Sequence, residues 1–235
     1  MPLVVPLGLL AGLLTTLAGM GGGIVLLLAL SLSTSPQTAL AVTAPALLLS
    51  NLHRAVLFRR AVDRTVAAPL ILGTIPGSVV GGLLLPTIPA LWLQGLMLAM
   101  TALSLARALG VLKFSLSPRA LGPAGFVMGA LSATSGGAGL LLAPVLLTAG
   151  LSGDRYVATT AAIAVAMHVG RVVAYGATGL VDPHTLAVSA VLLVALLIGN
   201  ALGARLRPRL TPQRSTQIEY GTLLVAVVLS VAGLH

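Results

Sequence analysis

Long apolar segments dominate this sequence, and they restrict it to a fold within a lipid bilayer. Eight such segments follow one another, separated by short joints that carry charge or proline. The segments cover residues 3–32, 38–58, 66–85, 90–109, 120–151, 156–178, 185–206 and 217–234. A helix needs about 20 apolar residues to cross a hydrocarbon core about 30 Å thick. Because only 7% of the residues are charged, against about 25% in a typical soluble domain, the sequence predicts an all-α, polytopic integral membrane protein.

The first and fifth segments are longer than the others, and glycine interrupts both of them. The first contains Gly19-Met20-Gly21-Gly22-Gly23, and the fifth contains a run of small residues from Ser132 to Gly139. Consecutive glycines are unfavourable in a helix interior. Unwound backbone at membrane depth is tolerated only where it is buried in protein or lines a cavity. We therefore expect two broken helices that are enclosed by the rest of the protein.

The two halves of the chain share an ordered set of residues, which indicates an internal repeat. A shift of 117 positions aligns Gly12 with Gly129, Thr43 with Thr160, Asn51 with His168, Arg54 with Arg171 and Phe58 with Tyr175. A slightly larger shift aligns the GxxxG runs at 77–81 and 199–203, which are most simply packing motifs because small residues let membrane helices approach. We divide the chain into two membrane repeats, residues 1–116 and 117–235, that form one transmembrane domain. Chance similarity between apolar helices is the alternative.

The distribution of basic residues favours one topology over another, because cytoplasmic loops collect Lys and Arg. If all eight segments span the membrane, the basic residues of the joints divide six against five. If the fifth segment instead enters and leaves on one side, all eleven lie on the same side, and the joints at 86–89 and 179–184 have none. The same behaviour in the first segment predicts two inverted repeats. Each has three spanning helices and one re-entrant segment; eight through-spanning helices are the alternative.

In the re-entrant topology, both termini lie outside the cell and the basic loops lie in the cytoplasm. Residues 1–10 contain no Lys or Arg, whereas a secretory leader begins with positive charge. We therefore expect the first segment to belong to the mature protein.

Arg171 is the most informative charged residue, because it lies near the middle of its segment. A charge there costs at least about 2.5 kcal/mol and usually faces a cavity or a partner. His168 and Tyr175 share its helical face. We interpret Arg171 as a ligand for an anion, with hydrogen bonds to carbonyls of the broken segments as the alternative. His168 could carry a proton or simply line a helix contact.

Arg54 is the counterpart of Arg171 in the first half, and Asn51 shares its face. It could contact substrate, or it could extend its charge to the interface near Arg59 and Arg60. No carboxylate lies in the middle of an apolar segment, where it could hold a cation. The acidic residues, all in joints or at segment ends, are Asp63, Asp154, Asp182 and Glu219. The sequence therefore predicts an electropositive site.

The glycine breaks add backbone donors to this site, because the N-terminus of a half-helix has partial positive charge and suits anions. Close helix packing is the alternative role for these small residues. The candidate substrate-binding residues are Arg171, Arg54, His168, Asn51, Gly21, Gly22, Gly23, Ser135, Gly136 and Gly137. We expect no catalytic residues, metal site or cofactor, because cysteine is absent and the sequence lacks HExxH, GxSxG, paired carboxylates and nucleotide-binding motifs.

The order of these motifs resembles the TauE/SafE family of sulfite and organosulfur-anion exporters. The resemblance rests on Gly19 to Ile24, on Ser35-Pro36-Gln37-Thr38-Ala39, on a helix from Thr43 to Asn51, and on Ser135 to Gly139. It covers nearly the whole chain and implies movement of small sulfur-containing anions across a bacterial inner membrane, with the two breaks beside the permeation site. Ala138 interrupts the second glycine run, which departs from the family's usual pattern.

The combined prediction is a secondary transporter of sulfite or a related oxyanion that works by alternating access. One alternative is a proton- or cation-coupled carrier of another small metabolite, and another is a non-transporting scaffold subunit. The expected partners are the small anion and the lipid bilayer. A homodimer is possible through the glycine-rich faces, although these could equally pack within one chain. Nucleic acid is not expected despite a net charge of +9, because the basic residues lie mostly in short joints.

Overall fold

The computed structural model describes residues 3–18, 21–111, 116–137 and 139–234. Within these ranges all regular structure is helical. The α-helices are α1 (Val4–Ala18), α2 (Gly22–Ser33), α3 (Pro36–Leu57), α4 (Arg64–Leu84), α5 (Ala90–Ala108), α6 (Leu121–Ser135), α7 (Gly139–Thr148), α8 (Gly153–Ala177), α9 (Pro183–Leu206) and α10 (Pro212–Ala232). Short 3-10 helices cover Arg59–Ala61, Leu85–Thr87, Pro118–Ala120 and Arg207–Arg209. The prediction of an all-helical protein is confirmed.

Four of the helices are long and apolar enough to cross a membrane. They cover Pro36–Leu57, Arg64–Thr87, Gly153–Ala177 and Pro183–Leu206. The described apolar parts of α5 and α10 are shorter than 18 residues. By length and composition, the described residues therefore supply four of the six spans that the sequence predicts.

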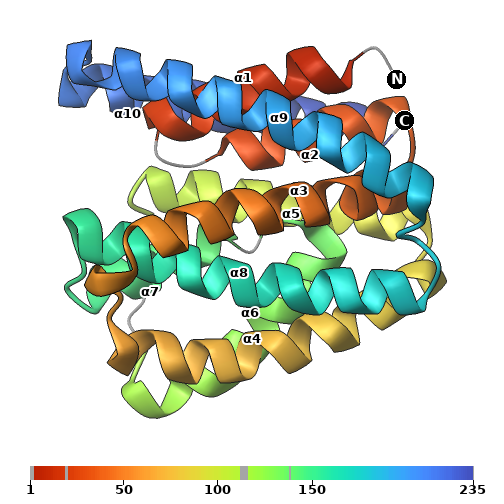
Figure 1. The fold of residues 1–235 in the computed structure, drawn as a ribbon, viewed down its shortest axis with the longest axis horizontal. Helices are drawn as coiled ribbons and strands as arrows, with labels where there is room; N and C mark the ends of the chain where they lie inside the picture. Colours follow the sequence, from red (N-terminus) through yellow and green to blue (C-terminus); the bar gives the residue numbers. More distant parts are fainter. Residues whose placement is uncertain (1–2, 19–20, 112–115, 138, 235) are drawn as a thin grey trace.

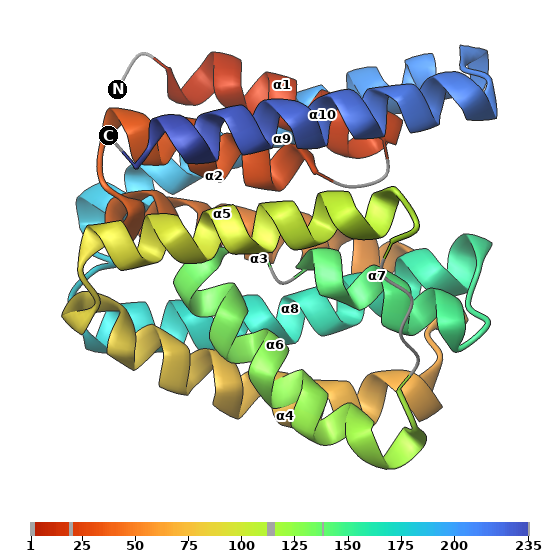
Figure 2. The same ribbon diagram turned by 180° about the vertical axis from the view of Figure 1, so that it is seen from behind.

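The main helix contacts between the two halves each have an equivalent contact in which the corresponding helices of the halves change places. α3 and α8 lie side by side at the centre of the molecule (Figure 1), with α9 against α3 and α4 against α8. α1 packs on α9, and α6 packs on α4. α5 and α10 contact each other on the face seen from behind (Figure 2). The helix that begins each broken segment therefore packs against a long helix of the other half.

The GxxxG runs provide these contacts between the halves. A Cβ atom on Gly77 of α4 would lie 2.0 Å from the carbonyl oxygen of Phe126 on α6. A Cβ atom on Gly199 of α9 would lie 2.2 Å from the carbonyl oxygen of Leu9 on α1. These distances leave no room for any side chain, so the helices touch through their backbones. The prediction that both runs are packing motifs is confirmed.

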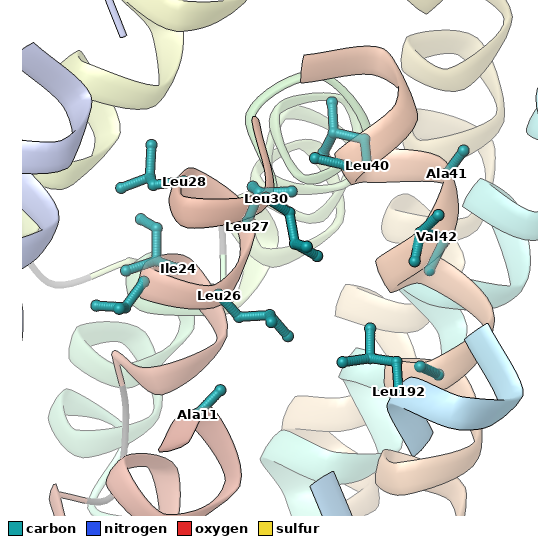
Figure 3. Close-up of a cluster of buried hydrophobic side chains, with 14 of the residues drawn as sticks. Ala11, Ile24, Leu26, Leu27, Leu28, Leu30, Leu40, Ala41, Val42 and Leu192 are labelled. Atoms are coloured by element: carbon teal, nitrogen blue, oxygen red, sulfur yellow. The ribbon is translucent and has the colours of Figure 1, made fainter. Parts of the chain in front are cut away.

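The half-helix α2 is enclosed by protein, although it is too short to span the bilayer. Its residues from Ile24 to Leu28 are all buried, and Figure 3 shows Leu26 and Leu27 on the side of α2 that faces Leu40 of α3 and Leu192 of α9. A helix that is apolar on every side belongs in a protein core or in lipid. Its neighbours from Ile24 to Leu28 are protein, whereas the turn from α2 into α3, at Leu32 to Thr34, is exposed. Ser35 supports that turn, because its hydroxyl accepts a hydrogen bond from Thr38 N at 3.1 Å and caps α3.

The joint before α4 connects the two halves through Asp63. One carboxylate oxygen caps α4 by accepting from the backbone N–H groups of Thr65 at 3.0 Å and Val66 at 3.2 Å. The other oxygen pairs with Arg155 at the start of α8. The backbone N–H of Asp63 donates to the hydroxyl of Thr159 at 3.0 Å. The Val66 N–H is the main reason that the pKa of Asp63 is lowered, and the Arg155 guanidinium lowers it further.

We expect Asp63→Ala to lower stability by about 1 kcal/mol, the usual cost of losing an N-cap. Because the folded state depresses the Asp63 pKa, this contribution is complete above the unfolded value of about 3.9. It is lost as the pH falls through the folded value. Thermal unfolding in detergent should therefore show a deficit at pH 7 that shrinks at acid pH. Arg155→Ala is the control and should cost less than about 1 kcal/mol, because the Arg155 side chain is 64% exposed. A deficit that does not change with pH would contradict this account.

Candidate functional site

A cavity of about 180 Å³ lies between the central helices and the two glycine breaks. A single buried water needs about 10–15 Å³ by the same measure, so the space can hold a small solute. The lining residues are Thr15 (α1), Gly21, Gly23, Ile24 and Leu27 (first break and α2), Thr43, Leu47, Asn51 and Arg54 (α3), Ser132 (α6), Gly136, Gly137 and Leu142 (second break and α7), and Thr160, Ala164, Met167, His168 and Arg171 (α8). Both halves of the chain contribute residues to the wall.

Ten of the lining residues form five pairs under the 117-residue shift. The pairs are Thr15 with Ser132, Thr43 with Thr160, Leu47 with Ala164, Asn51 with His168, and Arg54 with Arg171. Five pairs of positions that the 117-residue shift aligns therefore border one cavity. Corresponding residues of the two halves face the same space.

Arg171 is 1% exposed and is held by three protein groups. Its Nη2 donates to the carbonyl oxygen of Leu40 on α3 at 3.0 Å, and its Nε donates to the hydroxyl of Tyr175 at 3.3 Å. The Tyr175 hydroxyl in turn donates to the carbonyl oxygen of Ala133 on α6. The Tyr175 ring adds a cation–π contact, with its centroid 5.6 Å from the guanidinium carbon. Arg171 therefore ties α8 to α3 and α6 while it borders the cavity.

His168 completes the environment of Arg171. Its Nδ1 lies 3.2 Å from Nη1 of Arg171. A guanidinium can only donate, so we assign Nδ1 as the acceptor and place the single ring proton on Nε2. The geometry therefore describes a neutral imidazole in this conformation.

Arg54 is less well satisfied than Arg171. Its Nη2 donates to Oδ1 of Asn51 at 2.7 Å, and Nδ2 of Asn51 donates to the carbonyl oxygen of Leu47 at 2.8 Å. The Nε of Arg54 is buried and has no hydrogen-bond partner among the residues that the structure describes. The side chain borders the cavity as well as lying one turn from the basic joint.

Backbone conformation at the breaks explains why glycine occupies them. Gly21 has φ of +94° and Gly136 has φ of +68°, in the region that other residues rarely adopt. Each of these glycines lies at the end of a half-helix, so the chain can reverse beside the cavity. Gly21 and Gly23 line the cavity wall, so the N-terminal end of α2 lies beside the cavity. Gly19, Met20 and Ala138, which the sequence also assigns to the breaks, lie outside the described residues.

Eight of the ten predicted substrate-binding residues line this cavity, and two do not. Gly22 faces α1 instead, where a Cβ would lie 2.2 Å from the carbonyl oxygen of Ala11. Ser135 is fully buried, and its hydroxyl donates to the carbonyl oxygen of Leu131 at 2.7 Å. Both residues lie in runs of small residues that the sequence assigns to the site as a whole. Neighbouring positions of a helix point in different directions, so only some members of each run face the cavity.

The sequence interpretation did not include several lining residues. Thr15 aligns with Ser132 under the 117-residue shift, so a fuller use of the repeat could have found it. No sequence feature pointed to the apolar lining residues, which are Ile24, Leu27, Leu47, Leu142, Ala164 and Met167. Ordinary apolar residues of membrane helices look alike in sequence whether they face lipid, protein or a cavity.

The charges at the cavity favour an anion. Its described lining contains two arginines and no carboxylate. Asp63, Asp154 and Asp182 lie in joints or at helix starts. In the part of the chain that the structure describes, no three His, Asp or Glu residues are grouped so that they could hold a metal ion. The cavity can therefore attract an oxyanion and offer it hydrogen-bond donors.

Comparison with known proteins gives one match. A family model described as sulfite exporter TauE/SafE matches residues 4–232 of this 235-residue chain. Searches of curated proteins and of solved structures gave no match.

Proposed function

Because the chain belongs to the TauE/SafE sulfite exporter family, we propose that it is a secondary transporter of sulfite or a related sulfur-containing oxyanion. It acts in the bacterial inner membrane by alternating access. The observation that carries this proposal is the cavity with two arginines and, among the described residues, no carboxylate. Arg54, Arg171, Asn51 and His168 contribute to its polar wall, together with the hydroxyl residues Thr15, Thr43, Ser132 and Thr160. The glycines of the two breaks, Gly21, Gly23, Gly136 and Gly137, bring backbone to the same space.

The exchange of packing partners between the halves supports an inverted-repeat mechanism. In such transporters the site lies at the repeat interface beside broken helices, and one part rocks against the other. Here α1 with α2, and α6 with α7, each form a pair of half-helices that turns back at its glycine break (Figures 1 and 2). We infer three spans and one re-entrant pair in each repeat, with the basic joints in the cytoplasm and both termini outside.

The membrane potential supplies a driving force for export. An anion that leaves an inside-negative cell gains about 2.3 kcal/mol per charge per 100 mV. The sequence contains no nucleotide-binding motif, so the proposed mechanism relies on gradients.

Flux of radiolabelled sulfite and sulfate into proteoliposomes tests this function. With a potassium diffusion potential that is positive inside, we expect uptake of at least one of the two anions well above that of protein-free liposomes. Reversing the potential should slow the uptake. Uptake that requires sodium would indicate the cation-coupled alternative. Absence of flux for both anions at both polarities would contradict the proposal.

A further inference from the structure

Two buried polar side-chain atoms have no partner among the described residues, and both belong to residues that line the cavity. They are Nε of Arg54 and Oγ1 of Thr160. Leaving a buried donor unsatisfied is costly, and more so for a charged group. Such groups in a native structure call for an explanation such as a ligand or water. Both atoms are shielded from water, so a side-chain rotation must accompany binding in the cavity that their residues line, which is large enough for a small oxyanion.

We propose that Arg54 and Thr160 are the direct donors to the substrate anion, one from each half of the protein. This inference rests on the proposed function and makes its site specific. The Nε–H of Arg54 and the hydroxyl of Thr160 each donate to an oxygen of the anion. The ligand class is therefore a small oxyanion with at least two acceptor oxygens. Because α3 supplies one donor and α8 the other, the bound anion bridges the two repeats.

The repeat relationship strengthens this choice of donors. Thr43 is the counterpart of Thr160, and its hydroxyl bonds the carbonyl oxygen of Ala39 in its own helix at 2.8 Å. Threonine in a helix commonly makes this bond to the residue four positions earlier. Thr160 lies in the interior of α8 but has no such bond among the described residues. The Thr160 hydroxyl therefore has no competing hydrogen bond to give up, whereas that of Thr43 is already engaged.

Arg171 differs from its counterpart Arg54 in that protein groups contact all of its guanidinium nitrogens. Each of its three nitrogens already contacts a protein group, namely Leu40, Tyr175 or His168. We assign Arg171 as a positioning residue that holds α8 against α3 and adds positive charge to the cavity. The geometry thus separates two arginines that the sequence treats as equivalent.

Isothermal titration of the detergent-purified protein with sulfite and with sulfate tests the assignment. We expect Arg54→Lys to weaken binding at least tenfold, because it keeps the charge but removes the Nε donor. Thr160→Val keeps the shape and removes the hydroxyl, so it should weaken binding about tenfold, the effect of one hydrogen bond to a charged ligand. Thr74→Val is the matched control, since that buried hydroxyl bonds its own helix at Ile71 outside the cavity lining; binding should be unchanged. Melting temperatures establish that each variant is folded.

Three results would overturn the assignment while leaving the transport function in place. The first is wild-type affinity in both Arg54→Lys and Thr160→Val. The second is a loss in Thr43→Val as large as that in Thr160→Val, which would mean that the hydroxyls of both halves act alike. The third is competition by chloride as strong as that by sulfate, which would indicate a site for charge alone. Wild-type protein that neither binds nor transports either anion would instead overturn the proposed function.

Discussion

Replacing Gly77 with valine is expected to prevent the chain from folding. The first atom of any side chain at this position would lie 2.0 Å from the Phe126 carbonyl oxygen and 2.7 Å from its carbonyl carbon. These are backbone atoms of α6, so no rotamer change can relieve the clash, and the two helices must separate. Overpacking a core usually costs about 1–3 kcal/mol. We expect more than about 3 kcal/mol here, a large share of a typical total of about 5–15 kcal/mol.

Gly95→Ala is the matched control for this prediction. Gly95 also lies inside a helix, but a Cβ there meets no atom within 4 Å. Alanine is favoured over glycine by about 1 kcal/mol in a helix interior, so this variant should melt at the same temperature or higher. Size-exclusion profiles and thermal unfolding in detergent measure both effects. A well-folded Gly77→Val variant would show that α4 and α6 are not in backbone contact.

The same experiment on Gly199 examines the equivalence of the halves. A Cβ at Gly199 would lie 2.2 Å from the Leu9 carbonyl oxygen, so its contact with α1 mirrors that of Gly77 with α6. Valine at Gly199 should therefore be about as damaging as valine at Gly77. A mild effect at Gly199 alone would argue against repeats that pack in the same way.

Helix positions were the most predictable part of the fold, because apolar length controls them. The sixth apolar segment, residues 156–178, corresponds to α8 at Gly153–Ala177. The extent of the breaks was less predictable. Gly22 and Gly23 were expected to be unwound but lie in α2, since the absent Cβ of Gly22 lets α2 approach Ala11 of α1. Close packing thus overrides the intrinsic preference of glycine.

Most of the residues that line the cavity were predictable from the sequence, but the hydrogen-bond partners of each residue were not. A shift of 117 positions pairs Arg54 with Arg171, and both line the cavity. The sequence ranked Arg171 first because it is nearer the middle of its segment. Which arginine is satisfied by protein depends on how α3 and α8 meet in three dimensions. Leu40 and Tyr175 happen to reach Arg171, and a sequence repeat contains no such information.

Replacing Arg171 with methionine is expected to reduce anion flux at least tenfold while the protein remains folded. Methionine fills a similar volume, and exchanging a buried charge for a well-packed apolar residue is often neutral for stability. Of the groups left behind, Tyr175 still donates to the Ala133 carbonyl and Leu40 lies within helix α3, where carbonyls have backbone partners; Nδ1 of His168 alone loses the donor described for it. Flux should fall because one of the two described positive charges at the cavity is lost.

Arg171→Lys and Tyr175→Phe separate the charge of Arg171 from its hydrogen bonds. The lysine variant keeps the charge, so its flux should exceed that of Arg171→Met. The phenylalanine variant keeps the arginine but removes the hydroxyl that links it to α6, so it should lower the melting temperature more than the initial rate. These proteoliposome rates must be compared at equal amounts of folded protein. If Arg171→Met transports sulfite as fast as the wild type, the charge at this position does not act on the permeating anion.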